Sequence, residues 1–336
     1  MIQTNVRSRS RRRTILIIAI ALLVVAIVAV KISSFRSGES MVTHLVRVAV
    51  LPMLQVKSTM QNVDRYHELV QKRQADGDAR PSEKLKKQFD IHPESINGYL
   101  YYVVSPKTAK PDRAIIYIHG GAYVGPMADF QWNLVKGLAE RTSAQLIVPN
   151  YPLAPKHSWK DAYAMMLQLY DKLIQQFPAN RISITGDSAG GGLALGLSME
   201  LREQGKPMPG SIVLFSPFLN LLADNPAQAA LEDVDPLLAR PALVWAAKQW
   251  AHDTPLDDPH ISPVLGNLAG LPPTLVFSGT ADLLHVDALQ FVERARAQGV
   301  DVTYIEGRNM THGWSVLPLP EAASLYDAAA SFIGQH

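Results

Sequence analysis

Short apolar runs alternate with amphipathic helical stretches over most of the chain, and this alternation limits the fold more than any other feature. Helical stretches such as residues 162–176 and 289–297 separate most of the runs. Strands that alternate with helices of this length predict βαβ units and a parallel sheet covered by helices. The sequence therefore predicts an α/β fold with a mostly parallel central sheet flanked by helices. The predicted strands are residues 99–104, 114–118, 145–148, 182–185, 212–215, 274–277 and 302–305.

Two regions do not follow the alternation. Residues 219–260 contain Asp, Pro and Trp with a single helical stretch near residues 241–250, which predicts a cap inserted above the sheet. Residues 34–96 begin with a Ser- and charge-rich tether and continue with helical spacing, which predicts N-terminal cap helices. The main domain is accordingly expected over residues 97–336.

The N-terminus has the pattern of a membrane anchor. Residues 14–30 carry no charge, and as a helix they would span about 25 Å, close to the hydrocarbon thickness of a bilayer. Residues 1–13 contain five arginines, at positions 7, 9, 11, 12 and 13. The sequence thus predicts a basic cytoplasmic segment over residues 1–13 and a transmembrane signal anchor over residues 14–33. By the positive-inside rule the rest of the chain lies outside the cytoplasm, in the periplasm of a Gram-negative cell. A cleaved signal peptide is the alternative.

Charge and cysteine content exclude several classes of function. A net charge of +2 over 336 residues argues against a nucleic-acid partner, which requires a dense basic surface. The chain has no cysteine, so disulfides, thiolate metal sites and cysteine nucleophiles are excluded. The sequence does not determine the oligomeric state.

A serine between two glycines marks the end of one predicted strand. Gly186-Asp187-Ser188-Ala189-Gly190 follows residues 182–185, and a helical stretch begins at once. A sharp turn from strand to helix exposes the serine hydroxyl and needs small residues on both sides. The position favours Ser188 as a nucleophile, although a Gly/Ser-rich loop is the simpler alternative.

A second glycine pair follows the strand at residues 114–118. His119-Gly120-Gly121-Ala122 could be a tight turn, or its backbone N–H groups could point into a cleft. Donors that face the oxygen of an attacked carbonyl are worth about 3–4 kcal/mol each. We therefore expect an oxyanion hole formed by Gly120, Gly121 and Ala189.

A serine nucleophile needs a base, and the base needs a carboxylate to orient it. On a parallel sheet of this kind these residues follow in the order serine, acid, histidine. Asp282 and His312 each follow a predicted strand in that order, which predicts a triad with Ser188. Asp287 is the alternative acid. Taken singly, Asp282 could cap a helix and His312 could be a loop residue.

Together these motifs resemble the hormone-sensitive-lipase-like branch of the α/β-hydrolase superfamily. Further similar stretches are residues 151–157, 215–220 and 271–274. The resemblance implies an α/β-hydrolase fold with a helical cap and carboxylester hydrolysis through an acyl-enzyme, without cofactor or metal. Ala122 replaces the third glycine of the pattern, and Pro152, Lys156 and Asn220 also depart from it.

The expected function is therefore a serine carboxylesterase acting on a small-molecule ester with a short to medium acyl chain. The same triad could instead serve a deacetylase or an amidase. A non-catalytic receptor on this fold is less favoured because all three triad residues are present. Substrate recognition is expected in the cap, with Tyr123, Trp159, Trp245 and Trp250 as candidate lining residues.

Overall fold

The computed structural model describes residues 27–336, and an eight-stranded sheet forms its centre. The strand order is β1-β2-β4-β3-β5-β6-β7-β8. The pairs β1/β2 and β2/β4 are antiparallel and the other neighbours are parallel, which confirms the mostly parallel sheet. The strands are β1 (Phe89–Ile96), β2 (Tyr99–Pro106), β3 (Ala114–Ile118), β4 (Gln145–Pro149), β5 (Ile182–Asp187), β6 (Ser211–Phe215), β7 (Thr274–Ala281) and β8 (Val302–Thr311).

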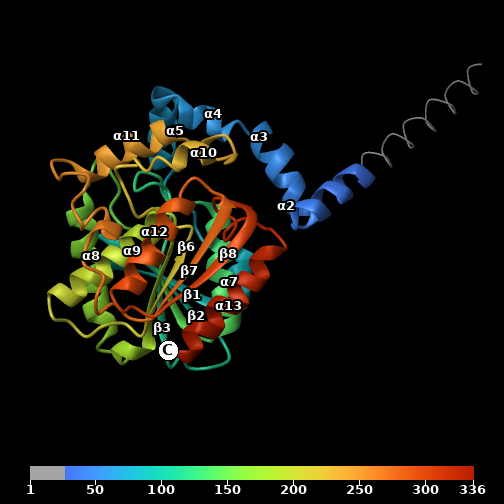
Figure 1. Ribbon diagram of the computed structural model, residues 1–336. Helices are drawn as coiled ribbons and strands as arrows, with labels where there is room; N and C mark the ends of the chain where they lie inside the picture. Colours follow the sequence, from blue (N-terminus) through green and yellow to red (C-terminus); the bar gives the residue numbers. More distant parts are fainter. Residues whose placement is uncertain (1–26) are drawn as a thin grey trace, which may run out of the picture.

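Helices cover both faces of the sheet, as Figure 1 shows. One face carries α8 (Trp159–Leu173), α9 (Ala189–Glu203) and α12 (His285–Ala297), and the other carries α7 (Trp132–Thr142) and α13 (Glu321–Gln335). Every residue of β3, β5 and β6 is buried. Strands covered on both sides read as continuous apolar runs, which is why the sequence revealed them.

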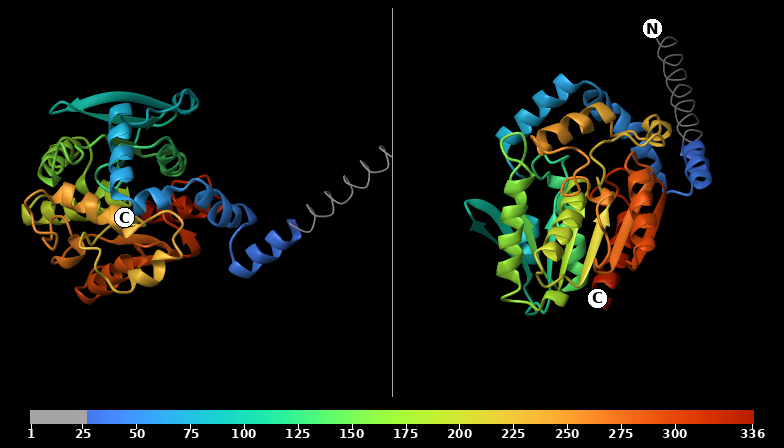
Figure 2. Two further views of the ribbon diagram at one scale, coloured as in Figure 1. Left: turned by 90° about the horizontal axis from the view of Figure 1, so that it is seen from above. Right: turned by 60° about the vertical axis from the view of Figure 1, so that its left-hand side comes forward.

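The first strand lies where the sequence predicted cap helices. Residues 89–96 form β1, which pairs with β2 along its whole length, so the sheet begins before residue 97. Its residues alternate between partly buried and exposed, and Pro93 lies within it. A strand at a sheet edge tolerates both proline and polar residues. The β1–β2 hairpin projects from the molecule in the left view of Figure 2.

A helical cap lies over the carboxyl ends of the strands (Figure 1). It combines α4 (Val56–Gln61) and α5 (Val63–Asp76) with α10 (Gln228–Glu232) and α11 (Arg240–Ala251) from the insertion. The helix expected near residues 241–250 is α11. Trp245 of α11 packs edge-on against Tyr66 of α5, with ring centroids 5.6 Å apart, and so joins the two parts of the cap.

The N-terminal segment precedes the cap along one side of the molecule (Figure 1). Residues 27–37 are helical and are followed by α2 (Met41–Leu45), the π-helical turn η1 (Val46–Val50) and α3 (Leu51–Met53). Residues 1–26 lie outside the description, and with them most of the predicted anchor at residues 14–33. Within residues 27–336, none of the helices combines the length and apolar character needed to cross a bilayer. The remaining elements are α6 (Glu83–Gln88), η2 (Asp129–Gln131), η3 (Ala179–Arg181) and η4 (Pro263–Leu265).

Candidate active site

Ser188 occupies a strained turn between β5 and α9. Its backbone has φ 53° and ψ −122°, a conformation rarely adopted by residues with a side chain. A Cβ atom on Gly186 would lie 2.2 Å from the carbonyl oxygen of Gly190, and one on Gly190 would lie 2.0 Å from that of Ile118. The two glycines are therefore required by close backbone contact on either side of the serine.

The structure brings Ser188, His312 and Asp282 together. His312 Nε2 lies 2.9 Å from Ser188 Oγ. Its Nδ1 lies 3.1 Å from each carboxylate oxygen of Asp282, whose side chain is fully buried. Asp282 follows β7 and His312 follows β8. Because β7 and β8 are parallel neighbours, the two residues lie side by side at the carboxyl ends of these strands. The arrangement has the geometry of a nucleophile, a base and an orienting acid.

The surroundings of His312 favour its protonated form. Burial alone would lower the pKa of the imidazole. The negative charge of Asp282 and its hydrogen bond outweigh that effect, so the pKa of His312 lies above its ordinary value. The carboxylates of Asp235 and Asp187 act in the same direction. These charges stabilise the imidazolium that forms when the histidine takes a proton.

The alternative acid lies elsewhere. Asp287 is in α12 and its Oδ2 accepts a hydrogen bond from Gln228 Nε2 at 3.1 Å, while its Oδ1 has no partner among the described residues. Burial, with the nearby charges of Asp224 and Asp282, raises its pKa to about 7. Asp282, and not Asp287, contacts His312, so Asp282 is the candidate acid that the geometry favours.

The predicted oxyanion hole needs one correction. The backbone N–H of Gly120 donates a hydrogen bond to Asp187 Oδ1 at 3.0 Å, so it does not face the cleft. Among residues 27–336, no partner is found for the N–H groups of Gly121, Ala122 and Ala189. Ala122 has φ 53°, a left-handed conformation that turns the loop after Gly121. The N–H groups that remain free to form an oxyanion hole are therefore those of Gly121, Ala122 and Ala189. Ala122 takes the place predicted for Gly120.

Asp187 is a residue that sequence reasoning missed. Its Oδ1 accepts hydrogen bonds from Tyr117 Oη (2.6 Å) and Gly120 N, and Gln131 Nε2 lies 3.0 Å from its Oδ2. A Cβ on Gly120 would lie 2.5 Å from the same carboxylate. Asp187 thus ties the loop of Gly120 to the residue before Ser188. No sequence signal shows this role, because the middle residue of Gly-x-Ser can vary.

His119 supports the same loop. It is fully buried, stacks on Tyr151 with ring centroids 4.5 Å apart, and its Nδ1 lies 2.8 Å from the carbonyl oxygen of Gly120. Tyr151 Oη donates to the carbonyl oxygen of His119 at 3.0 Å. His119 is therefore structural, since His312 is the histidine beside Ser188.

Asp235 links the cap to the triad and was also missed. Its Oδ1 accepts hydrogen bonds from the N–H groups of Leu237 and Leu238, and its Oδ2 accepts one from Leu283 at 2.8 Å. Leu283 directly follows Asp282. Burial, together with the charge of Asp282, raises the pKa of Asp235 to about 6. A cap carboxylate thereby fixes the turn that presents the acid of the triad.

The candidate aromatic residues divide into two groups. Tyr123 and Trp250 are fully buried and stacked, with centroids 4.6 Å apart. Trp245 packs within the cap, and Trp159 stacks on His260 at 5.0 Å. The first pair lies beside the loop after Gly121, whereas the other two residues hold helices together.

One group of described side chains has the chemistry of metal ligands. Donor atoms of Glu200, Glu203 and His260 lie within 4.8 Å of one another. Glu200 is twelve residues from Ser188 along α9, which is about 18 Å of helix. The group therefore takes no part in the arrangement around Ser188.

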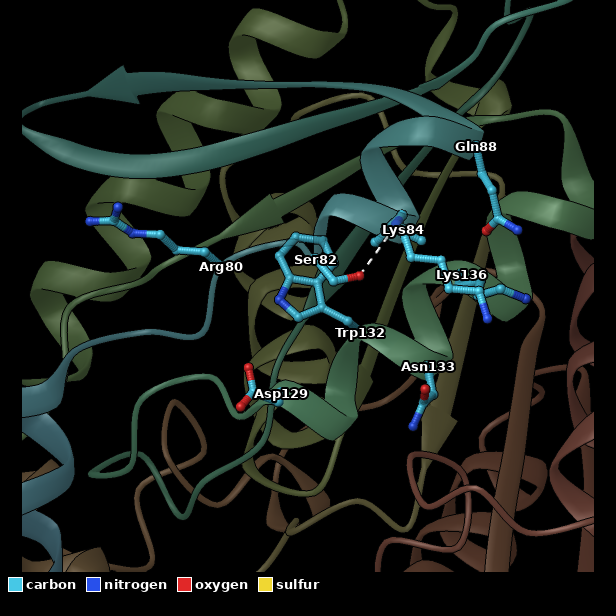
Figure 3. Close-up of a pocket in the computed structure, with 9 residues that line it drawn as sticks. Arg80, Ser82, Lys84, Gln88, Asp129, Trp132, Asn133 and Lys136 are labelled. Carbon is cyan, nitrogen blue, oxygen red and sulfur yellow. Dashed lines mark hydrogen bonds between the residues drawn. The ribbon is translucent and has the colours of Figure 1, made fainter.

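A hollow of about 430 Å³ lies on another part of the surface, between α6 and α7 (Figure 3). Trp132 lies at its centre, and its Nε1 donates to the carbonyl oxygen of Ala79 at 3.1 Å. Ser82 caps α6 by accepting a hydrogen bond from Leu85 N at 3.2 Å. The hollow contains no residue of the triad.

The three residues brought together at this site lie in a region that matches a known protein family. A family model described as an alpha/beta hydrolase fold matches residues 115–316, which include Ser188, Asp282 and His312. The chain belongs to the α/β-hydrolase family. The resemblance to the hormone-sensitive-lipase-like branch is confirmed by relatives of that branch among solved structures.

Relatives of this α/β-hydrolase are named as ester hydrolases. An esterase of Acinetobacter venetianus is 36% identical over 58% of the chain and 65% of its own length. A triacylglycerol lipase of Mycobacterium tuberculosis is 33% identical over 60% of the chain and 42% of its own length. An acetyl-hydrolase of Streptomyces hygroscopicus is 30% identical over 66% of the chain and 75% of its own length. The chain thus spans less than two thirds of the first two relatives.

Solved structures agree in fold. An esterase/lipase from an uncultured bacterium has a TM-score of 0.71 at 27% identity and covers 81% of this chain and 90% of its own. An esterase from the bacterial hormone-sensitive lipase family has a TM-score of 0.70 at 25% identity and covers 81% and 97%. The α/β-hydrolase fold predicted from the sequence is confirmed.

Proposed function

We propose that the chain is a serine carboxylesterase that hydrolyses short- to medium-chain acyl esters through an acyl-enzyme. The observation that carries the proposal is the continuous contact from Ser188 Oγ through His312 to the buried Asp282. The family, and the names of its relatives as an esterase and a triacylglycerol lipase, support ester hydrolysis as the reaction. No metal or cofactor is required for this chemistry.

In the proposed mechanism, Ser188 Oγ attacks the ester carbonyl while His312 Nε2 takes its proton. The carbonyl oxygen becomes negative and is held by the N–H groups of Gly121, Ala122 and Ala189. Asp282 keeps Nδ1 protonated and stabilises the imidazolium. His312 then gives its proton to the alcohol as the C–O bond breaks. Water repeats the sequence on the acyl-enzyme and releases the acid.

Hydrolysis of p-nitrophenyl esters with acyl chains of two to twelve carbons tests the proposal. We expect turnover on the shorter chains, and loss of at least about 10³-fold in kcat for Ser188→Ala, because only the oxyanion donors remain. The chain length at which activity ends measures the acyl pocket. Asp287→Asn serves as a matched control that removes a buried carboxylate outside the triad.

Two results would contradict the esterase proposal. Equal turnover by the wild type and Ser188→Ala would place the chemistry elsewhere. No turnover on any chain length, with both proteins folded, would favour an amidase or a receptor.

Acetyl esters form a second candidate substrate class. One relative is named an acetyl-hydrolase and another an ethyl acetate hydrolase, at 30% and 29% identity. Tyr123 and Trp250 fill space beside the loop of Gly121, which favours a small acyl group. A kcat/KM that is highest for acetyl and falls with each added carbon would select this class.

We also propose that the enzyme is held at a membrane by residues 14–33, with the catalytic domain outside the cytoplasm. Support comes from the uncharged run of residues 14–30 and the arginines before it. Mass spectrometry of the N-terminus after carbonate extraction of membranes distinguishes a retained anchor from a cleaved signal peptide.

A further inference from the structure

The N-terminal segment presents an unusual apolar surface to the outside. Of the sixteen large apolar side chains that are exposed within residues 27–336, eleven lie in residues 27–54. Phe35 is 87% exposed, Met53 81% and Leu54 63%. Soluble proteins rarely concentrate exposed apolar side chains in this way. We call this surface the apolar face; it consists of Ile27, Val28, Ile32, Phe35, Met41, Val42, Leu45, Val48, Val50, Met53 and Leu54.

The side of the segment that meets the body of the protein is largely polar, although Val46 packs against the core and Leu51 is buried. The N–H of Ser40 donates to Glu321 Oε1 of α13 at 2.6 Å, and Thr43 Oγ1 donates to Oε2 of the same carboxylate. Asn309 Nδ2 donates to the carbonyl oxygen of Ser37 at 2.7 Å. A helix on the surface of a soluble protein normally turns its apolar side inward. Here most of the large apolar side chains point outward, so the apolar face needs an apolar medium outside the protein.

The charges around the apolar face identify that medium. Lys31 and Arg36 are exposed beside it. Between residues 27 and 63 the one carboxylate is Glu39, which is buried and paired with Arg47 and His44. Within residues 27–63, apolar side chains with cations and no exposed carboxylate match the interface of an anionic lipid bilayer, although Asp233 of the cap is exposed nearby. The uncharged residues 14–30 lead directly into this segment.

We infer that the apolar face rests in a lipid bilayer, with residues 27–33 continuing the proposed anchor and residues 35–54 lying in the interfacial layer. A hollow of about 440 Å³ lies beside this face, between residues 47–61 and the cap turn of residues 233–236. Asp235 lines the hollow and holds Leu283, the neighbour of Asp282, by its hydrogen bond. The hollow thus joins the lipid-facing segment to the cap turn whose Asp235 holds the residue after Asp282. If the proposed esterase activity holds, its substrates are lipophilic esters delivered from the bilayer.

Single-cysteine labelling of the full chain tests the apolar face directly. Because the protein has no cysteine, Met53→Cys carries one label, and Leu289→Cys in α12 carries a control label at another exposed apolar position. Both variants are reconstituted into vesicles of phosphatidylcholine and phosphatidylglycerol and labelled with a bimane fluorophore. We expect brominated lipids to quench the label at position 53 several-fold more than the label at 289, and aqueous iodide to do the reverse.

Two outcomes of the labelling overturn the inference. A label at position 53 that iodide reaches as readily as it reaches position 289 means that the face lies in water. A label protected from both quenchers means that protein covers the face, either a second copy or the first residues of the chain. Neither reading depends on enzyme activity.

A second comparison tests delivery of the substrate. Met53→Glu combined with Leu54→Glu is expected to lower kcat/KM at least about tenfold for a medium-chain acyl ester of a lipophilic alcohol embedded in vesicles, and to leave it unchanged for a water-soluble acetyl ester. Leu289→Glu is the control. Equal rates on the vesicle ester would refute delivery from the bilayer. Absence of turnover on both substrates in the wild type would refute the proposed function, and the labelling result would still stand.

Discussion

At the scale of single residues, two carboxylates outside the triad control its geometry. Asp187 fixes the loop of Gly120 and so decides which N–H groups face the cleft. Asp235 fixes Leu283 and adds a negative charge that favours protonated His312. Both are buried. The site is therefore tuned by charges that reach His312 from the cap and from the strand of the nucleophile.

The pH profile of the enzyme tests the role of Asp235. In the proposed mechanism His312 must be neutral to accept the proton of Ser188. We therefore expect kcat/KM to fall as the pH drops through the pKa of His312, which lies above the ordinary value of about 6.5. Asp235→Asn removes a negative charge that stabilises the imidazolium. We expect the acid limb of the kcat/KM profile to move to lower pH in this variant. Profiles measured between pH 5 and 9 on one soluble ester give the comparison.

The control for Asp235 is its exposed neighbour Asp233. Asp233→Asn changes the net charge equally but lies at the surface, so its profile should match that of the wild type. An acid limb that stays in place in Asp235→Asn, with kcat reduced at every pH, would mean that Asp235 is only structural.

The arrangement of Ser188, Asp282 and His312 could be predicted from the sequence, whereas the two supporting carboxylates could not. Ser188, Asp282 and His312 each follow a strand, and parallel strands place their carboxyl ends on one rim. Asp187 and Asp235 act through contacts with residues 67 and 48 positions away. No local pattern records such contacts. The same reason explains the wrong prediction that Gly120 belongs to the oxyanion hole. Its N–H donates to the side chain of Asp187 in β5, a contact between segments distant in the sequence.

At the scale of elements, local pattern decided what could be predicted. The buried strands β3, β5 and β6 are continuous apolar runs, and the sequence identified them. The edge strand β1 is polar and contains Pro93, so its residues resembled the helical region before it. Its pairing with β2 is a tertiary contact, which single-sequence patterns do not show.

Helix α12 contains a buried carboxylate that should make stability depend on pH. The pKa of Asp287 is about 7 in the folded protein, against 3.8 as its ordinary value. A raised pKa stabilises the fold at low pH, and this stabilisation is lost as the pH rises through about 7. Asp287→Asn lacks the charge, so we expect its free energy of unfolding to exceed that of the wild type by about 1–3 kcal/mol at pH 8.

Urea unfolding at pH 5 and pH 8 measures this effect. The advantage of Asp287→Asn should grow from the lower to the higher pH. Glu293→Gln changes an exposed carboxylate on the same helix and should follow the wild type at both values. A constant difference between Asp287→Asn and the wild type would show that Asp287 does not change its charge in this range.

At the scale of the whole molecule, specific polar contacts join the N-terminal segment, the cap and the sheet. Lys57 Nζ donates to the carbonyl oxygen of Asp235 at 2.8 Å, linking the segment after α3 to the cap turn beside the triad. Glu321 links α2 to α13. The predicted division into anchor, cap and hydrolase domain did not include these links. The helical spacing of residues 41–87 predicts helices but does not show which part of the protein they contact.

Glu321 should decide whether the N-terminal segment stays on the body. Burial alone would raise its pKa, but hydrogen bonds from Thr43 and Ser40 outweigh burial and lower it. A lowered pKa stabilises the docked segment above the ordinary value of 4.5, and that stabilisation is lost as the pH falls through the lowered value. Glu321→Ala removes the acceptor at every pH. We expect amide hydrogen exchange in residues 40–54 to rise at least about tenfold at pH 7, with β5 and β6 unchanged.

Thr43→Val tests the same contact by changing the hydrogen-bond donor in the N-terminal segment instead of the acceptor in α13. It removes one donor to Glu321 and leaves α13 intact, so exchange should rise in the same residues by a smaller factor. Faster exchange in α13 and the sheet, with none in residues 40–54, would show that Glu321 stabilises its own helix instead. Release confined to the segment means that the surface proposed to meet lipid can move without unfolding the enzyme, and activity on a soluble ester should then persist in both variants.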